Sequence, residues 1–201
     1  MFLSVAIFFV AVLAVALLLA LLWAVGLYNG LMAARGRVRS AFTQMEAQIK
    51  QRYSLIPSLV ETARTHMRHE RETLDAVISA GTVAVGAFQD MVASPSGQDA
   101  IQNWLRAEQA LGSAMGRLAS VSEVYPELKA DGTIVQLSEK LTLNDSALSL
   151  ARESYNSAVT AYHSARQTFP VVLCVGFLGF QEAPLCELKG PAQKETSNAD
   201  L

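Results

Sequence analysis

The sequence predicts an all-α protein in which an N-terminal transmembrane helix is followed by an antiparallel four-helix bundle. The first 34 residues contain no Asp, Glu, Lys or Arg. Beyond them, apolar residues recur at alternating three- and four-residue steps, which is the spacing of one helix face. Segments containing Pro and Gly separate these periodic rows, as expected for the connections between helices.

Residues 1–27 are predicted to be a membrane anchor, because the segment MFLSVAIFFVAVLAVALLLALLWAV is longer than the roughly 20 apolar residues that cross a bilayer. A cleaved signal peptide is the alternative, but it carries basic residues before a shorter apolar stretch. Here Arg35, Arg37 and Arg39 follow the stretch. By the positive-inside rule, we expect a single-pass protein of the cell (inner) membrane with its N-terminus outside and its bundle in the cytoplasm.

The first bundle helix is predicted from Tyr28 to about Ile49, and the second from Ser54 to position 92. Pro57 decides this boundary, because proline in a helix interior costs about 3 kcal/mol but is tolerated in a first turn. We therefore expect residues 51–54 to form a tight reversal with Ser54 as the N-cap. The alternative is one long kinked helix over residues 28–92.

Turn signals also mark the third and fourth helices. The segment ASPSGQD at 93–99 precedes the third helix and offers Ser96 or Asp99 as an N-cap. YPELKADG at 125–132 ends that helix and offers Asp131 or Gly132 as the start of the fourth. The fourth helix is expected to end at Phe169, before a proline. Residues 28–180 form the predicted bundle, and residues 181–201 are polar enough to be a disordered tail.

Several blocks of the sequence resemble the LemA family. They are YNGLMAARGRVRSAFTQMEAQIKQRYSLIPSLVETARTHMRHERETLDAV at 28–77, YPELKADGTIVQLSEKL at 125–141 and ARESYNSAVTAYHSARQTFP at 151–170. The resemblance implies an N-terminal anchor, a helical cytoplasmic bundle and no established enzymatic activity. The same family includes the MamQ proteins of the magnetosome membrane. Phe42 and Asn144 depart from the family's usual residues, so the role of no subgroup is carried over.

His66, His69 and Glu70 are the only clustered residues of metal-ligand type that we single out. His66 and Glu70 are one helical turn apart and could share a metal. However, the only other histidine is His163, and the Glu-x-x-His pairs of di-iron bundles are missing. Nucleophile, Walker and dinucleotide motifs are missing as well. We therefore predict no enzyme, no cofactor and no metal, and we keep a metal-binding or enzymatic bundle that uses these three residues as the alternative.

Four polar residues occupy positions where their helices otherwise place apolar side chains. They are Arg35, Glu70, Glu108 and Asn144. With the reversal at 51–54, the helical rise brings all four to similar heights above the membrane. One hypothesis is a paired polar layer that fixes the register of the helices. The alternative is that some of these residues face solvent.

The unequal lengths of the rows predict that one apolar segment overhangs toward the bilayer. The candidates are residues 81–88 and residues 169–180, both too short to span it. Each could instead pack in the core. Cys174 and Cys186 match no zinc or redox motif, and no role is assigned to them.

The predicted partners are the lipid bilayer and an unknown protein, and the nearly balanced charge indicates no nucleic-acid surface. Self-association through close packing of anchors is a further hypothesis, based on rows of small residues. These are Ala16, Ala20, Ala24, Gly26 and Gly30. The predicted function is a non-enzymatic scaffold that binds partners or organises membrane.

Overall fold

The computed structural model describes residues 2–94, 97–169, 171–176 and 179–187, without the side chains at 2–10, 20, 129, 173 and 174. The described residues contain six helices and no strand, so the all-α class is confirmed. The helices are α1 (Phe2–His66), α2 (Arg71–Ala93), α3 (Gln98–Ser122), α4 (Pro126–Ala130), α5 (Gly132–Gln167) and α6 (Val171–Cys174).

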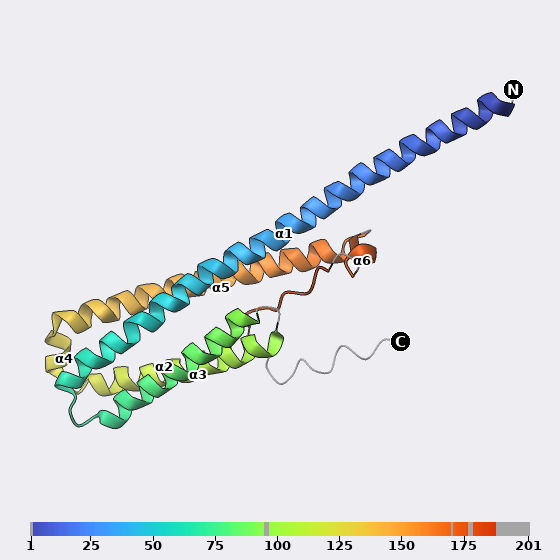
Figure 1. The fold of residues 1–201 in the computed structure, drawn as a ribbon. Coiled ribbons are helices and arrows are strands. Elements are labelled where there is room, and N and C mark those ends of the chain that lie inside the picture. The colour runs from blue at the N-terminus through green and yellow to red at the C-terminus, as the bar shows by residue number, and fades with distance from the viewer. Residues whose placement is uncertain (1, 95–96, 170, 177–178, 188–201) are drawn as a thin grey trace.

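Four long helices form the bundle, and each reverses the direction of the one before it (Figure 1). The C-terminal half of α1 lies beside α5, and α2 lies beside α3. The N-terminal half of α1 leaves the bundle as a single extended helix. Its apolar window is 0% buried, whereas the apolar window of α2, which is also long enough to cross a membrane, is partly buried.

Helix α1 continues through Pro57, so the predicted reversal at residues 51–54 is wrong. The alternative of one helix from 28 to 92 is also wrong, because α1 ends at His66. Proline removes one backbone hydrogen bond, but the side chains around it are buried. Ile56, Leu59 and Val60 are each at most 7% exposed. This packing offsets the cost of Pro57, which itself faces solvent.

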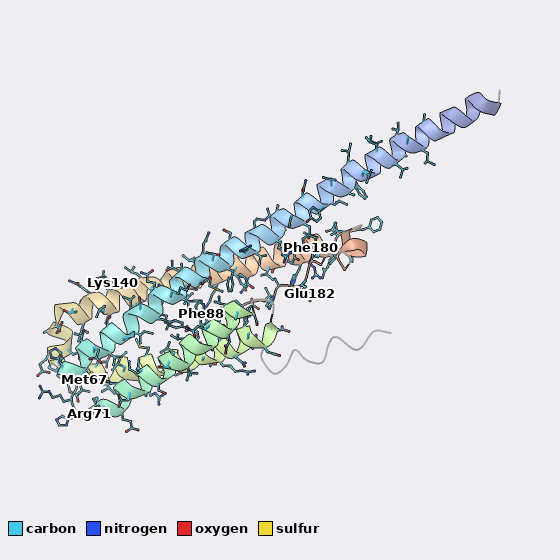
Figure 2. All side chains as sticks on the ribbon, in the orientation of Figure 1. Met67, Arg71, Phe88, Lys140, Phe180 and Glu182 are labelled. Atoms are coloured by element: carbon cyan, nitrogen blue, oxygen red, sulfur yellow. The ribbon has the colours of Figure 1, made fainter. Side chains whose placement is uncertain are left out.

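The chain reverses between α1 and α2 at residues 67–70, without glycine or proline. Met67 N–H donates to the Ala63 carbonyl, and Glu70 N–H donates to the Met67 carbonyl at 3.1 Å. Met67 is completely buried, so it anchors the corner from inside. Figure 2 labels Met67 and Arg71 at this distal end of the bundle, and Phe180 and Glu182 at the opposite end.

The core runs along the whole bundle. A distal cluster contains side chains from all five helices α1 to α5, and Val60, Leu74, Leu111 and Ile134 are among its members. A central cluster is built around Met45, Ile49, Phe88, Trp104 and Tyr155. A third cluster, at the end from which the anchor leaves, contains Leu31, Ala34, Tyr162, Val175 and Phe180.

Of the two predicted starts of α5, Asp131 is the N-cap and Gly132 is the first helical residue. The Asp131 carboxylate accepts hydrogen bonds from the backbone N–H groups of Thr133 and Ile134, as an N-cap does. The start of α3 differs from the prediction, because its N-cap is Gly97 without a side-chain bond. Asp99 lies in the first turn, and Ser96 is outside the described residues. The segment at 126–130, predicted as part of a turn, forms the short helix α4.

Of the two candidate overhanging segments, residues 81–88 belong to α2 and pack one face into the bundle, while Val83 on the other face is 61% exposed. Ala84 and Phe88 are buried, and the Phe88 ring meets the Tyr53 ring at 5.9 Å. The described residues of the 169–180 segment lie at the end from which the anchor leaves, where Val175 and Phe180 pack against Leu31 of α1. The difference follows from length: α2 has 23 residues, about 35 Å, and α5 has 36, about 54 Å.

The packed chain continues beyond position 180, where the bundle was predicted to end. Tyr162 donates to the Gln181 carbonyl at 2.9 Å, and Tyr155 donates to the Pro184 carbonyl at 2.8 Å. Cys186 is 5% exposed within the central cluster. Residues 181–187 therefore lie along α5, and we call this segment the strap. The strap is the last described part of the chain. The predicted disordered tail otherwise lies outside the described residues.

Candidate functional site

The strongest polar feature in the described chain is a network around Glu108 of α3. This residue is 7% exposed. The Tyr53 hydroxyl donates to Glu108 Oε1 at 2.6 Å, and Arg52 Nη1 donates to Oε2 at 3.3 Å. Arg152 Nη2 lies 3.5 Å from the same Oε2 atom. The carboxylate is thus held by two residues of α1 and one of α5, which links three helices.

Trp104 extends the network. Its indole N–H donates to the Tyr53 hydroxyl oxygen at 2.9 Å, and the Arg152 guanidinium lies 5.0 Å from the ring centroid. The Tyr53 oxygen is also 3.3 Å from the Ala84 carbonyl of α2. A hydroxyl has one proton, and the charged, shorter contact to Glu108 is the stronger of the two.

The surroundings of Tyr53 keep its hydroxyl protonated. Burial raises the pKa of Tyr53 far above its ordinary value, and the negative charge and hydrogen bond of Glu108 raise it further. The phenol therefore acts as a permanent donor. With both oxygens of Glu108 engaged by donors or cations, this arrangement suits a structural clasp rather than a proton-transferring base.

Asn144 forms a second buried contact between α1 and α5. The residue is 3% exposed, and its amide donates to the backbone carbonyl and to Oε1 of Gln48, both at 3.1 Å. The predicted burial of Glu108 and Asn144 is therefore confirmed, and both bind polar groups of a neighbouring helix.

The hypothesis of one polar layer with Arg35 and Glu70 is wrong. Because α1 is continuous to His66, Arg35 and the corner at Glu70 are about 45 Å apart. Arg35 is exposed, and its guanidinium lies 5.8 Å from the Phe180 ring centroid. Glu70 accepts a hydrogen bond from the Tyr125 hydroxyl at 3.1 Å.

The alternative prediction was a metal site at His66, His69 and Glu70. In the structure, His66 and Glu70 contact other side chains. His66 Nε2 lies 3.0 Å from Asp131 Oδ2, and Glu70 binds Tyr125. His69 is exposed at the corner. Within the described residues, no three His, Cys, Asp or Glu side chains gather as metal ligands. His66 and Glu70 thus bind the connection between α3 and α5.

An apolar groove of about 630 Å³ opens beside the Glu108 network. Gly112, Gly116 and Ala119 line one side of it, and Leu141 of α5 lines the other. The remaining lining residues are Arg52, Leu59, Ala63, Met115, Leu118, Ser122, Leu128, Ile134, Val135, Ser138, Thr142 and Asp145. Arg52 and Asp145 form an ion pair at 3.3 Å, so the groove has one charged end.

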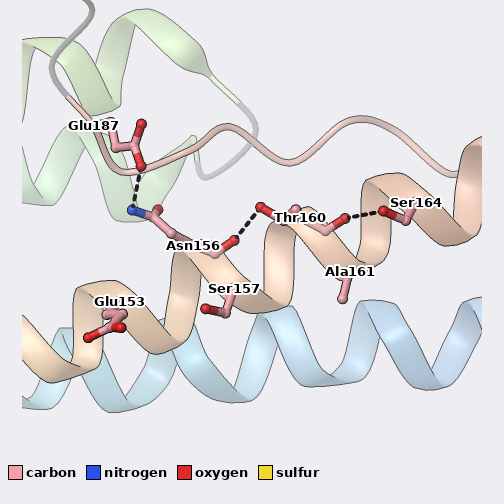
Figure 3. Close-up of a pocket in the computed structure, with 7 residues that line it drawn as sticks. All are labelled: Glu153, Asn156, Ser157, Thr160, Ala161, Ser164 and Glu187. Carbon is pink, nitrogen blue, oxygen red and sulfur yellow. Dashed lines mark hydrogen bonds between the residues drawn. The ribbon is translucent and has the colours of Figure 1, made fainter.

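A polar hollow lies where the strap meets α5 (Figure 3). Asn156 donates to Glu187 Oε1 at 3.4 Å and accepts from the Cys186 backbone N–H at 2.8 Å. Burial raises the pKa of the Cys186 thiol to about 11, and Glu187 and Glu108 add to the rise while Arg152 opposes it. Cys186 is thus a protonated, buried thiol that packs in the core.

Sequence reasoning missed Arg52, Tyr53 and Arg152. The first two were placed in a supposed turn, which hid their alignment with Glu108. A glutamate within an apolar row was the available signal, since a buried carboxylate requires cations or donors nearby.

A protein-family model described as LemA family matches residues 41–199. This range includes the Glu108 network, the corner at 67–70, the groove and the strap. No curated protein matches the chain.

Proposed function

The chain belongs to the LemA family, and on that premise we propose that it is a single-pass membrane protein whose bundle is a non-enzymatic scaffold for partner proteins. The family assignment and the helical structure fit a membrane-associated helical protein. The anchoring, the scaffold role and the absence of catalysis are the proposal.

The observation that carries this proposal is the continuity of α1. Its N-terminal apolar window is 0% buried, whereas Leu31, Met45 and Ile49 of the same helix are at most 2% exposed. An apolar helix without protein contacts suits lipid surroundings. Because no flexible linker separates the two parts of α1, the helix would hold the bundle at a fixed distance from the bilayer.

The proposal that the bundle lacks chemistry of its own is supported by how its buried charges are used. Glu108 is engaged by Tyr53, Arg52 and Arg152. A catalytic acid or base needs a proton that it can exchange with a substrate, whereas this carboxylate is bound to groups that cross-link helices.

The groove between α3 and α5 is the surface that we assign to a partner protein. Its mostly apolar lining and charged end suit the apolar face of a partner helix that also carries a polar group. Gly112 and Gly116 have no side chain, so the α3 side of the groove is formed there by the helix backbone. A Cβ atom added at either position would meet nothing within 4 Å, so a side chain can start there without a clash of its Cβ atom.

The test is proximity labelling in the native host with the full chain. A groove-filling variant, Gly112→Leu, is compared with Ser113→Leu, which changes an exposed residue of the same helix outside the groove. We expect Gly112→Leu to lose specific neighbours that the wild type and Ser113→Leu retain. Identical neighbours for all three chains would contradict the assigned surface, and deletion of residues 1–27 tests whether the neighbours depend on the anchor.

Metal analysis of the purified chain separates the scaffold from the alternative based on His66, His69 and Glu70. Stoichiometric metal that is lost on His69→Ala or Glu70→Gln would overturn the non-enzymatic scaffold. The proposed orientation, with the N-terminus outside and the bundle in the cytoplasm, is tested by an alkaline phosphatase fusion after Leu201. We expect an inactive fusion, because the arginines after the anchor favour the cytoplasmic side.

A further inference from the structure

Apolar side chains remain exposed at the end of the bundle from which the anchor leaves. After α5 ends at Gln167, Phe169 is 75% exposed and Val172 of α6 is 50% exposed. On the same segment, Val175 is 8% exposed and packs in the third core cluster. The segment thus has an inner side fixed to the bundle and outer apolar side chains without a cover in the described chain.

The packing of α1 fixes the height of this segment relative to the anchor. Leu31 lies in one cluster with Val175 and Phe180, and the Tyr28 ring meets the Phe180 ring at 5.8 Å. Leu31 is about 6 Å along the helix axis from Leu27, where the predicted anchor ends. The headgroup region of a bilayer is about 5 to 8 Å thick on each side. Figure 1 shows α6 at the end of α5, where the N-terminal half of α1 leaves the bundle.

The charges around the segment suit a membrane surface. Arg35, Arg37 and Arg39 are exposed on the adjoining part of α1. The acidic residue of the strap nearest to this end, Glu182, pairs with Arg166 at 3.0 Å. Exposed arginines near aromatic and aliphatic side chains are typical of the headgroup boundary, where the cations meet lipid phosphates.

We infer that Phe169 and Val172 insert into the headgroup boundary of the bilayer that holds the anchor, as a second attachment point of the bundle. The ligand is a phospholipid surface, and its position follows from the packing of Leu31 and Tyr28, just after the exposed apolar helix, against Val175 and Phe180 of this segment. Two attachment points would limit the tilt of the bundle. The inference rests on the proposed membrane anchoring.

The test uses tryptophan quenching in vesicles of phosphatidylcholine with brominated acyl chains. The full-length chain carries Trp23 in the anchor, which is 57% exposed, and Trp104 in the core, which is completely buried. Emission lost in the wild type but not in Trp23→Phe reports the anchor. Phe169→Trp in the Trp23→Phe background then reports the patch, and Leu150→Trp in the same background is the control. Leu150 is 68% exposed on α5 and about 28 Å from the patch if measured along a helix.

We expect the tryptophan introduced at position 169 to be quenched about as strongly as Trp23, and the one at position 150 not to be quenched. Quenching of Trp23 alone would overturn the inference and leave the anchor intact. If Trp23 is also not quenched, both the anchor and the inference fail. Equal quenching at positions 169 and 150 would indicate general adsorption, and a blue-shifted but unquenched signal at position 169 would indicate cover by protein; either result overturns the inference.

Discussion

The middle of the bundle and its distal corner each contain a tyrosine that donates to a glutamate. Tyr53 donates to Glu108 at 2.6 Å, and Tyr125 donates to Glu70 at 3.1 Å. Glu108 is buried and is also approached by two arginines. Glu70 is half-buried at a helix end.

This difference shows how burial gives one chemical pair two structural roles. In the middle of the bundle, water cannot replace a lost partner, so each polar group depends on the others. At the corner, water can replace the lost contact at little cost. We therefore expect equivalent substitutions to have unequal effects in the two regions.

The largest effect is expected for Glu108→Leu. The substitution leaves Arg52 and Arg152 without their shared carboxylate, and we expect a loss of roughly 3 kcal/mol in the free energy of unfolding, the lower end for a broken buried pair. The lower end applies because Arg52 keeps Asp145 as a partner. Glu70→Leu at the corner should cost well under 1 kcal/mol. Urea melts of the full chain in detergent measure both, and equal losses would break the contrast.

The next effect concerns the tyrosine hydroxyls. Tyr53→Phe removes the donor to Glu108 and the acceptor of the Trp104 N–H, so we expect a loss of about 1 to 3 kcal/mol. Tyr125→Phe removes one contact of a hydroxyl that water can solvate, and its melt should coincide with that of the wild type. A larger shift for Tyr125→Phe than for Tyr53→Phe would reverse the assignment of the two regions.

The next prediction concerns the stability of the corner at acid pH, which depends on Asp131. Hydrogen bonds from the Thr133 backbone and from His66 lower the pKa of this carboxyl below its ordinary value of 3.8. A lowered pKa in the folded state adds stability above the pKa of the unfolded state, and this stability is lost as the pH falls through the folded value. Asp131→Asn should therefore reduce the fall in melting temperature below pH 4. A fall in melting temperature that is as steep in Asp131→Asn as in the wild type would contradict this role of Asp131.

A small effect is also expected for His66→Ala. The His66 ring contacts Asp131 at 3.0 Å but remains partly exposed. The hydrogen bond from the Thr133 backbone N–H to the Asp131 carboxylate stays in place. We expect a loss well under 1 kcal/mol in the urea melt, with His69→Ala as an exposed control at the same corner. A loss near that of Glu108→Leu would mean that the corner is as sensitive as the middle.

Local chemistry predicted several parts of this structure. The helical class, the exposed apolar helix and the Asp131 cap follow from composition, spacing and one side-chain acceptor, which need no distant partner. Glu108 and Asn144 were recognised as buried because they replace apolar residues in a periodic row. The same rule failed for Arg35, which lies near the end of its row where solvent is accessible.

The corner at residues 67–70 could not be read from periodicity. Ala63, Met67 and Leu74 are buried on both sides of it, and their spacing continues the three- and four-residue steps of a helix. The row therefore passes through the reversal without a break. Pro57 gave a local signal for a corner, but packing along α5 and α2 keeps α1 helical there.

By itself, the sequence determined which faces are apolar, where one helix is capped and that the N-terminal segment lacks charge, because these depend on neighbours along the chain. Only the tertiary structure decided which helices meet and at what height. That choice brought Arg52, Tyr53 and Arg152 to Glu108. It depends on the packing of side chains far apart in sequence, whose summed burial outweighs the local cost of one proline.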